Sequence, residues 1–174
     1  MSASTAEATK AEIILEPFGI KLLSPINLYY DLNGIPLDIY REDQYPDKKN
    51  IKNYEVNPPL KNNHFNQYVI TTECEYNYVT AVTARSGMIE INGTQIFNDI
   101  AEQLIDKYSN SKNTSIDEYF PDNLIRSVSI KLEDYLIWLS GNVMSDNLEE
   151  VYSISIEYRS NIHIDGCLTD KEGL

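Results

Sequence analysis

The longest stretch of alternating apolar and polar positions runs from Tyr68 to Arg85 and predicts β structure. Side chains two positions apart on a strand share a face, so one inward-facing set is expected. A single strand of this length is unusual, and we therefore expect a bulge or a turn near Asn77. The inward-facing set consists of Tyr68, Ile70, Thr72, Cys74 and Tyr76.

Two hairpins are predicted toward the ends of the chain. In the first, residues 27–32 and 35–41 flank Asn33-Gly34, a pair that favours a type I′ turn. Pro36 cannot donate a backbone hydrogen bond, so its arm belongs at a sheet edge. In the second, residues 151–159 and 162–168 are joined at Ser160-Asn161, and the core-facing positions are Tyr152, Ile154, Ile156 and Tyr158. Shorter apolar runs predict brief strands at 12–15, 20–23 and 88–91.

Apolar residues three and four positions apart predict two helices in the middle of the chain. The first helix follows Thr94, which can cap it, and its apolar stripe is Phe97, Ile100, Ala101, Leu104, Ile105 and Tyr108. The second begins either at a Ser115–Glu118 capping box or at Pro121, and it ends at Gly141. Its apolar positions are Leu124, Val128, Leu132, Tyr135, Leu136 and Leu139. The middle of this segment, 127–132, also alternates as a strand would.

These elements predict an α+β fold in which an antiparallel sheet, built from hairpins, packs against two helices. A chain of 174 residues is long enough for one domain with an ordinary core. We expect a single domain at 12–168, a flexible N-terminal tail at 1–11 and a frayed C-terminus at 169–174. The segment 42–66 is rich in Asp, Lys, Asn and Pro, and it predicts a long loop that contacts a neighbouring chain.

The acidic balance of the chain limits its partners. Lys and Arg number 14 and Asp and Glu number 27, which gives a net charge of −13. Such a chain repels phosphate backbones and anionic lipids, so neither direct nucleic-acid binding nor membrane binding is expected. Residues 1–11 lack the pattern of a secretory signal, and no apolar run approaches the ~20 residues of a membrane span. We expect a cytoplasmic protein or one assembled in a virion or particle.

Candidate catalytic and metal-binding residues are few. His163, Asp165 and Cys167 alternate on a predicted strand, and these residue types can form a nucleophile or a zinc site. Residues two apart on a strand lie roughly 6.5–7 Å apart, which is too far for direct proton transfer. His64 stands in the long loop, Cys74 is far in sequence from Cys167, and no common catalytic or phosphate-binding motif occurs. We expect no cofactor, no metal and no enzyme activity. A small enzyme that uses His163, Asp165 or Cys167 is a third hypothesis, after the two binding functions given below.

Tyrosine is the residue type that points most directly to function. The chain has 13 tyrosines, and five of them lie in or beside the first hairpin and the long loop. These five are Tyr29, Tyr30, Tyr40, Tyr45 and Tyr54. Tyrosine is enriched at protein interfaces, although strand propensity alone would also place it here. We interpret the group as an interaction surface.

The sequence therefore predicts a non-enzymatic protein–protein interaction subunit of a larger assembly. Arms, hairpins and long loops suit the exchange of segments between homo- or hetero-oligomeric subunits, as in the neck, tail or baseplate of a phage or phage-tail-like particle. The alternative is an acidic inhibitor or immunity-type protein that masks a basic site on a nuclease or defence complex. Binding of that second kind should weaken steeply with added salt.

Overall fold

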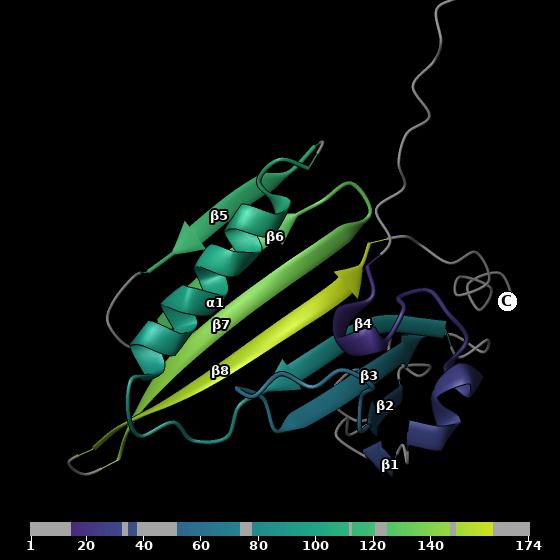
Figure 1. The fold of residues 1–174 in the computed structure, drawn as a ribbon, viewed down its shortest axis with the longest axis horizontal. Helices are drawn as coiled ribbons and strands as arrows, with labels where there is room; N and C mark the ends of the chain where they lie inside the picture. The colour runs from purple at the N-terminus through teal and green to yellow at the C-terminus, as the bar shows by residue number, and fades with distance from the viewer. Residues whose placement is uncertain are drawn as a thin grey trace, which may run out of the picture.

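The computed structural model describes residues 15–32, 35–37, 52–73, 78–111, 113–120, 125–146 and 149–161. Within these ranges, an eight-stranded antiparallel sheet carries one α-helix on one of its faces (Figure 1). The helix is α1 (Gly93–Tyr108), and two 3-10 helices, η1 (Pro17–Gly19) and η2 (Ile26–Leu32), precede the sheet. Among the helices described, none is long and apolar enough to cross a membrane.

The strands follow a simple order. Along the sheet it is β1-β2-β3-β4-β8-β7-β6-β5, so the last strand joins two meanders. The strands are β1 (Ile35–Leu37), β2 (Lys52–Glu55), β3 (Gln67–Glu73), β4 (Tyr78–Arg85), β5 (Ser115–Tyr119), β6 (Ile125–Lys131), β7 (Tyr135–Asp146) and β8 (Glu149–Ser160). The long β7–β8 hairpin forms the middle of the sheet, and β8 also pairs with β4.

One part of the core joins residues 15–26 to β3 and β4. The other part lies between α1 and the face of the sheet that α1 covers. Period-two alternation on β6, β7 and β8 sends apolar side chains to this face, and the helix adds its own stripe. Buried members from these elements are Val128, Ile130, Ile137, Leu139, Tyr152, Ile154, Ile156, Phe97, Ile100, Ala101, Leu104 and Tyr108. The predicted stripe of the first helix and the predicted inward face of residues 151–159 are therefore confirmed.

The predicted break in the Tyr68–Arg85 stretch is also confirmed. The stretch forms the β3–β4 hairpin, and its inward-facing Tyr68, Ile70 and Thr72 are buried. The predicted turn at Asn77, together with Cys74 and Tyr76, lies outside the described residues.

The predicted α+β class with two helices is wrong, because the chain is mainly β and the second helix is absent from the described residues. Its segment instead forms β6 and β7, Gly141 lies inside β7, and Ser115 and Glu118 belong to β5. Val128 and Ile130 alternate with serines, and the buried Ile137 and Leu139 alternate with the less buried Leu136 and Trp138, so each strand buries one face against α1. The helical spacing across 124–139 arose because two strands of alternating residues follow each other closely.

The first predicted hairpin is wrong in its first arm. Residues 27–32 belong to η2, whereas the second arm survives as the three-residue β1. β1 is an edge strand, as expected for the strand that contains Pro36. β2 forms inside the predicted long loop, and 20–23 is not a strand because Gly19 and Leu23 take positive φ angles of 78° and 62° and turn the chain. The Asn33-Gly34 turn and residues 12–14, 38–51 and 162–174 lie outside the described residues.

Candidate functional site

Of the five tyrosines predicted to form an interaction surface, Tyr29 and Tyr54 have described side chains. Tyr29 is half-buried, and its hydroxyl accepts a hydrogen bond from the Lys21 N–H at 2.9 Å and lies 3.0 Å from Ser24 Oγ. Tyr54 is half-buried on β2 and packs against the core. The Tyr30 side chain, Tyr40 and Tyr45 lie outside what the structure describes.

The candidate catalytic residues do not form a described site. His64 is exposed in the loop before β3, where its backbone N–H donates to Asn62 Oδ1 at 2.8 Å. His163, Asp165 and Cys167 lie outside the described residues. Among the residues that are described, no group of three or more His, Cys, Asp or Glu side chains could hold a metal ion.

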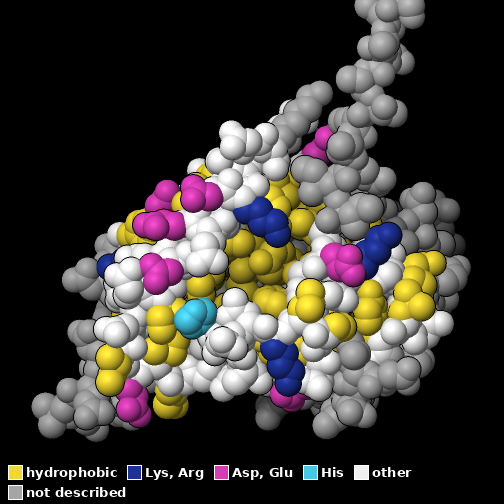
Figure 2. All heavy atoms as spheres, in the orientation of Figure 1, with side chains coloured by type: hydrophobic (Ala, Val, Ile, Leu, Met, Phe, Trp, Pro, Cys, Tyr) yellow, Lys and Arg dark blue, Asp and Glu magenta, His cyan; other side chains and the backbone are white. Residues whose placement is uncertain are grey.

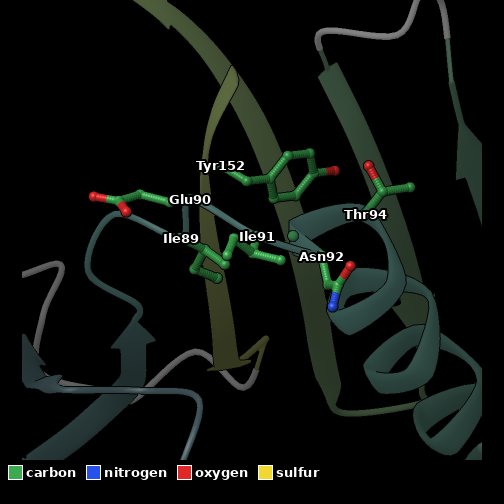
Figure 3. A pocket seen from close by; sticks show the side chains of 7 residues that line it. Ile89, Glu90, Ile91, Asn92, Thr94 and Tyr152 are labelled. Carbon is green, nitrogen blue, oxygen red and sulfur yellow. The ribbon is translucent and has the colours of Figure 1, made fainter. Parts of the chain in front are cut away.

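A hollow of about 460 Å³ lies at the beginning of α1, between the 89–94 segment and β8 (Figure 3). Asn92 precedes the helix with a φ of 62°, and no side chain caps the helix, so the predicted cap at Thr94 is wrong. Ile89 and Tyr152 hold this segment beside β8 through two backbone hydrogen bonds of 2.8 and 2.9 Å. The hollow therefore has a rigid wall and an uncapped helix end.

The buried hydroxyl of Tyr152, a residue that lines this hollow, does not point into it. The Tyr152 hydroxyl has no hydrogen-bond partner, and Figure 3 shows it directed away from Ile89 and Ile91. It lies against Gly141 on β7, where a Cβ would come within 2.6 Å of it. Burial raises the Tyr152 pKa, and the positive charge of Arg126 opposes that rise. A neutral, unpartnered phenol under the helix is a packing feature and supplies no reactive group.

A second tyrosine lies between α1 and the N-terminal segment. Tyr158 on β8 is half-buried, and its ring meets Phe18 edge-on at 5.9 Å. Figure 2 shows apolar side chains at the bottom of a hollow in this region of the molecule. Burial raises the Tyr158 pKa, and the neighbouring Tyr108 raises it further.

This raised pKa predicts an alkaline loss of stability. Below the ordinary tyrosine pKa of 10.0, the Tyr158 phenol is protonated in both the folded and unfolded chain, so it contributes no pH dependence. Above that pH the unfolded chain ionises first, and the free energy of unfolding falls. Tyr158→Phe should flatten this decline in denaturant titrations at rising pH. Tyr119→Phe, whose ring is exposed, is the matched control, and identical pH slopes in the wild type and Tyr158→Phe would contradict the prediction.

The most distinctive exposed feature lies on the opposite side of the sheet. We call this the outward face: the side of β5–β8 turned away from α1. Trp138 on β7 lies between Ser129 and Glu157 in the strand register, and 49% of its surface is exposed. Tyr119 and Ile125 are exposed on the same face by the same alternation. Among the described residues, three large exposed apolar side chains therefore share one face of the sheet.

Small hydroxyl side chains surround these apolar groups. Five serines alternate with the buried residues of β6, β7 and β8, so they point outward: Ser127, Ser129, Ser140, Ser153 and Ser155. Ser127, Ser140 and Ser155 are register partners and form one row across three strands. Because serine is short, these neighbours leave 49% of the Trp138 surface exposed.

Charge is arranged differently on the two sides of the molecule. On the outward face, Lys131 Nζ lies 3.2 Å from Asp117 Oδ2, and Arg159 Nε lies 2.8 Å from Glu157 Oε1. On the other side, acidic residues follow the exposed surface of α1 (Figure 2). These helix residues are Asp99, Glu102 and Asp106. The described carboxylates of β5–β8 on the outward face are thus paired, whereas the helix side is acidic.

Comparisons with known proteins add no identity to this geometry. No protein-family description, no curated protein and no solved structure matches the chain. Function is therefore argued from the surface alone.

Sequence reasoning missed Trp138 because it placed this residue on a helix. The signal that would have revealed it is the alternation in 127–132 and in 151–159. There, serines alternate along the chain with the buried Val128, Ile130, Ile154 and Ile156. Serines on one side of both β6 and β8, the two strands that flank β7, indicate an outward face that is small and polar. The exposed Trp138 on β7 lies among these serines.

Proposed function

We propose that this chain is a non-enzymatic protein-contact subunit that binds another polypeptide through the outward face. The observation that carries the proposal is Trp138, half-exposed in the middle strand of an uncovered serine-rich sheet surface. Tryptophan and tyrosine dominate the energetics of protein interfaces because they bury much area and lose few rotamers on binding.

The neighbours of Trp138 support the same function. Interface centres are depleted in unpaired charge, and the Asp117 and Glu157 carboxylates each have a cation beside them. Exposed apolar residues that gather on one patch mark contact surfaces more often than scattered ones do, and Tyr119, Ile125 and Trp138 gather here. Serines between them allow a partner to approach the backbone of the sheet closely.

Within this class we propose a structural subunit of a larger particle, such as the neck, tail or baseplate of a phage-like assembly. The outward face and the two edge strands, β1 and β5, supply separate contact surfaces on one small chain. Repeated contacts of this kind build symmetric assemblies, and a free edge can accept a strand from a neighbour.

The second candidate function, an acidic inhibitor or immunity-type protein, would use a different surface. It is favoured by the exposed carboxylates Asp99, Glu102 and Asp106 on α1 and by the net charge of −13. Such a protein would dock α1 on a basic site of a nuclease or defence complex, and added salt would weaken that contact.

Trp138→Ala should remove partner binding while leaving the fold intact. An interface anchor of this kind contributes at least about 2 kcal/mol, so Trp138→Ala should raise the Kd for the partner roughly 30-fold. The measurement compares proteins captured from the native source by tagged wild type and by Trp138→Ala, followed by titration of each captured partner. Leu60→Ala is the matched control, because Leu60 is 65% exposed but lies in the loop before β3.

The outcome also separates the two candidate functions. Loss of capture in Trp138→Ala, with full capture by Leu60→Ala, supports the outward face. Loss of capture in Glu102→Lys, with Trp138→Ala unaffected, supports the inhibitor and removes the reason for the first proposal.

A further inference from the structure

We propose that the partner bound to the outward face is a second copy of this chain, related by a two-fold axis that sets each Trp138 over the serines of the other copy. The inference rests on the proposed function and names its partner. It is carried by the shape of the outward face, by its charge and by the composition of the edge strand β5.

The outward face carries both a projection and a place to receive it. Trp138 stands in the row that contains Ser129 and Glu157, and the adjacent row is Ser127, Ser140 and Ser155, with Tyr119 at its β5 end. Adjacent rows on one face are two residues apart along the strand, roughly 7 Å. A two-fold contact places the same patch on both sides, so a ring and a recess offset by one row can fill each other reciprocally. Sheets packed face to face lie about 10 Å apart, which leaves room for one layer of indole rings.

The distribution of charge favours two copies meeting at this face. The described carboxylates of the outward face, Asp117 and Glu157, already lie beside Lys131 and Arg159, so close approach adds no unpaired anion there. In such a dimer the acidic α1 helices occupy opposite outer sides, far from each other. What remains is long-range repulsion between two chains of net charge −13, and salt screens that repulsion.

The edge strand β5 argues against the other simple homodimer, in which two sheets join edge to edge. Antiparallel pairing of β5 with its copy over all five residues would place Asp117 opposite Asp117. Like charges directly opposite each other destabilise a strand pair. Contact through the outward face has no such conflict and buries the exposed Trp138, Tyr119 and Ile125 instead.

The test is sedimentation equilibrium of the full chain over a range of concentrations at low and high salt. We expect a monomer–dimer equilibrium whose Kd falls as salt rises, the opposite of binding to a basic partner. Trp138→Ala and Ser140→Lys should each raise the Kd about 30-fold or more, and Leu60→Ala should leave it unchanged. Ser140→Lys places a charge on the outward face, so its effect does not depend on removing apolar area. Circular dichroism establishes that each variant is folded.

Two results would overturn the inference. In the first, the chain dimerises but folded Trp138→Ala and Ser140→Lys leave the Kd unchanged, so the dimer uses another surface. In the second, the chain is monomeric at every concentration and salt. If capture of a different subunit still requires Trp138, the second copy is wrong and the proposed function stands. If capture is also insensitive to Trp138, both are wrong.

Discussion

Phe97→Ala is expected to lower the free energy of unfolding by about 3–5 kcal/mol. Phe97 is 0% exposed in the second turn of α1, and its ring meets the Tyr152 and Phe120 rings edge-on at 6.5 and 6.4 Å. Alanine would leave a cavity between the helix and the sheet that neither element can close. Because small domains have only about 5–15 kcal/mol of stability, denaturant titration should show a large shift of the midpoint.

Phe120→Ala is the matched control for this prediction. Phe120 contacts the same ring, but 46% of its surface is exposed, so its loss removes less buried area and leaves no enclosed cavity. We expect a decrease of about 1 kcal/mol or less. Equal losses in Phe97→Ala and Phe120→Ala would mean that α1 does not dock on the sheet through Phe97.

Gly141→Ala should destabilise the protein by about 2–3 kcal/mol. A Cβ at this position in β7 would lie 2.6 Å from Tyr152 Oη, 2.7 Å from Phe97 Cδ2 and 2.8 Å from Tyr152 Cε1. In an uncrowded strand, replacing glycine by alanine raises the free energy of unfolding by about 0.5–1 kcal/mol. A decrease in Gly141→Ala would therefore indicate that the site is crowded. Thermal or denaturant unfolding measures it directly.

Tyr152→Phe tests whether the hydroxyl is the crowding atom. The hydroxyl has no hydrogen-bond partner, so Tyr152→Phe alone should cost little or stabilise. In that background Gly141→Ala should lose less stability, since the nearest atom is gone. Gly87→Ala is the control, because its nearest neighbour is the exposed side chain of Asn66. A stabilising Gly141→Ala, or the same loss in both backgrounds, would contradict the packing described here.

Local pattern was enough to predict the elements that bury one clear face. The α1 stripe has a single period over four turns, and the β8 positions from Tyr152 to Ile156 alternate, so each period indicated its element. The division of the Tyr68–Arg85 stretch into two strands, β3 and β4, was likewise predicted from the length limit of strands.

The same reasoning failed where two strands, β6 and β7, follow each other closely. Val128 and Leu132 precede Tyr135 and Leu139 at spacings that fit a helix as well as two alternating strands. Strand pairing decided between them, because β7 lies between β6 and β8 and pairs with β8 along its whole length. Tyr135 pairs with Ser160 at the far end of this hairpin, beyond the reach of a window of a few residues.

The candidate site was missed for the same physical reason. Exposure of Trp138 depends on which side of the sheet α1 covers, and that is decided by the strand register and not by the residues beside it. The five tyrosines, by contrast, were grouped by sequence proximity. Of these, Tyr29 uses its hydroxyl in a local hydrogen-bond pair and Tyr54 packs on the core.

Fluorescence quenching of Trp138 tests the role of the outward face most directly, because this is the one tryptophan in the chain. The measurement follows quenching by a small neutral solute as the chain is concentrated at high salt. The account predicts that the indole is readily quenched in dilute solution and becomes protected, with a blue-shifted emission, as copies associate. An indole that is equally accessible at every concentration and in the presence of captured partners would contradict it.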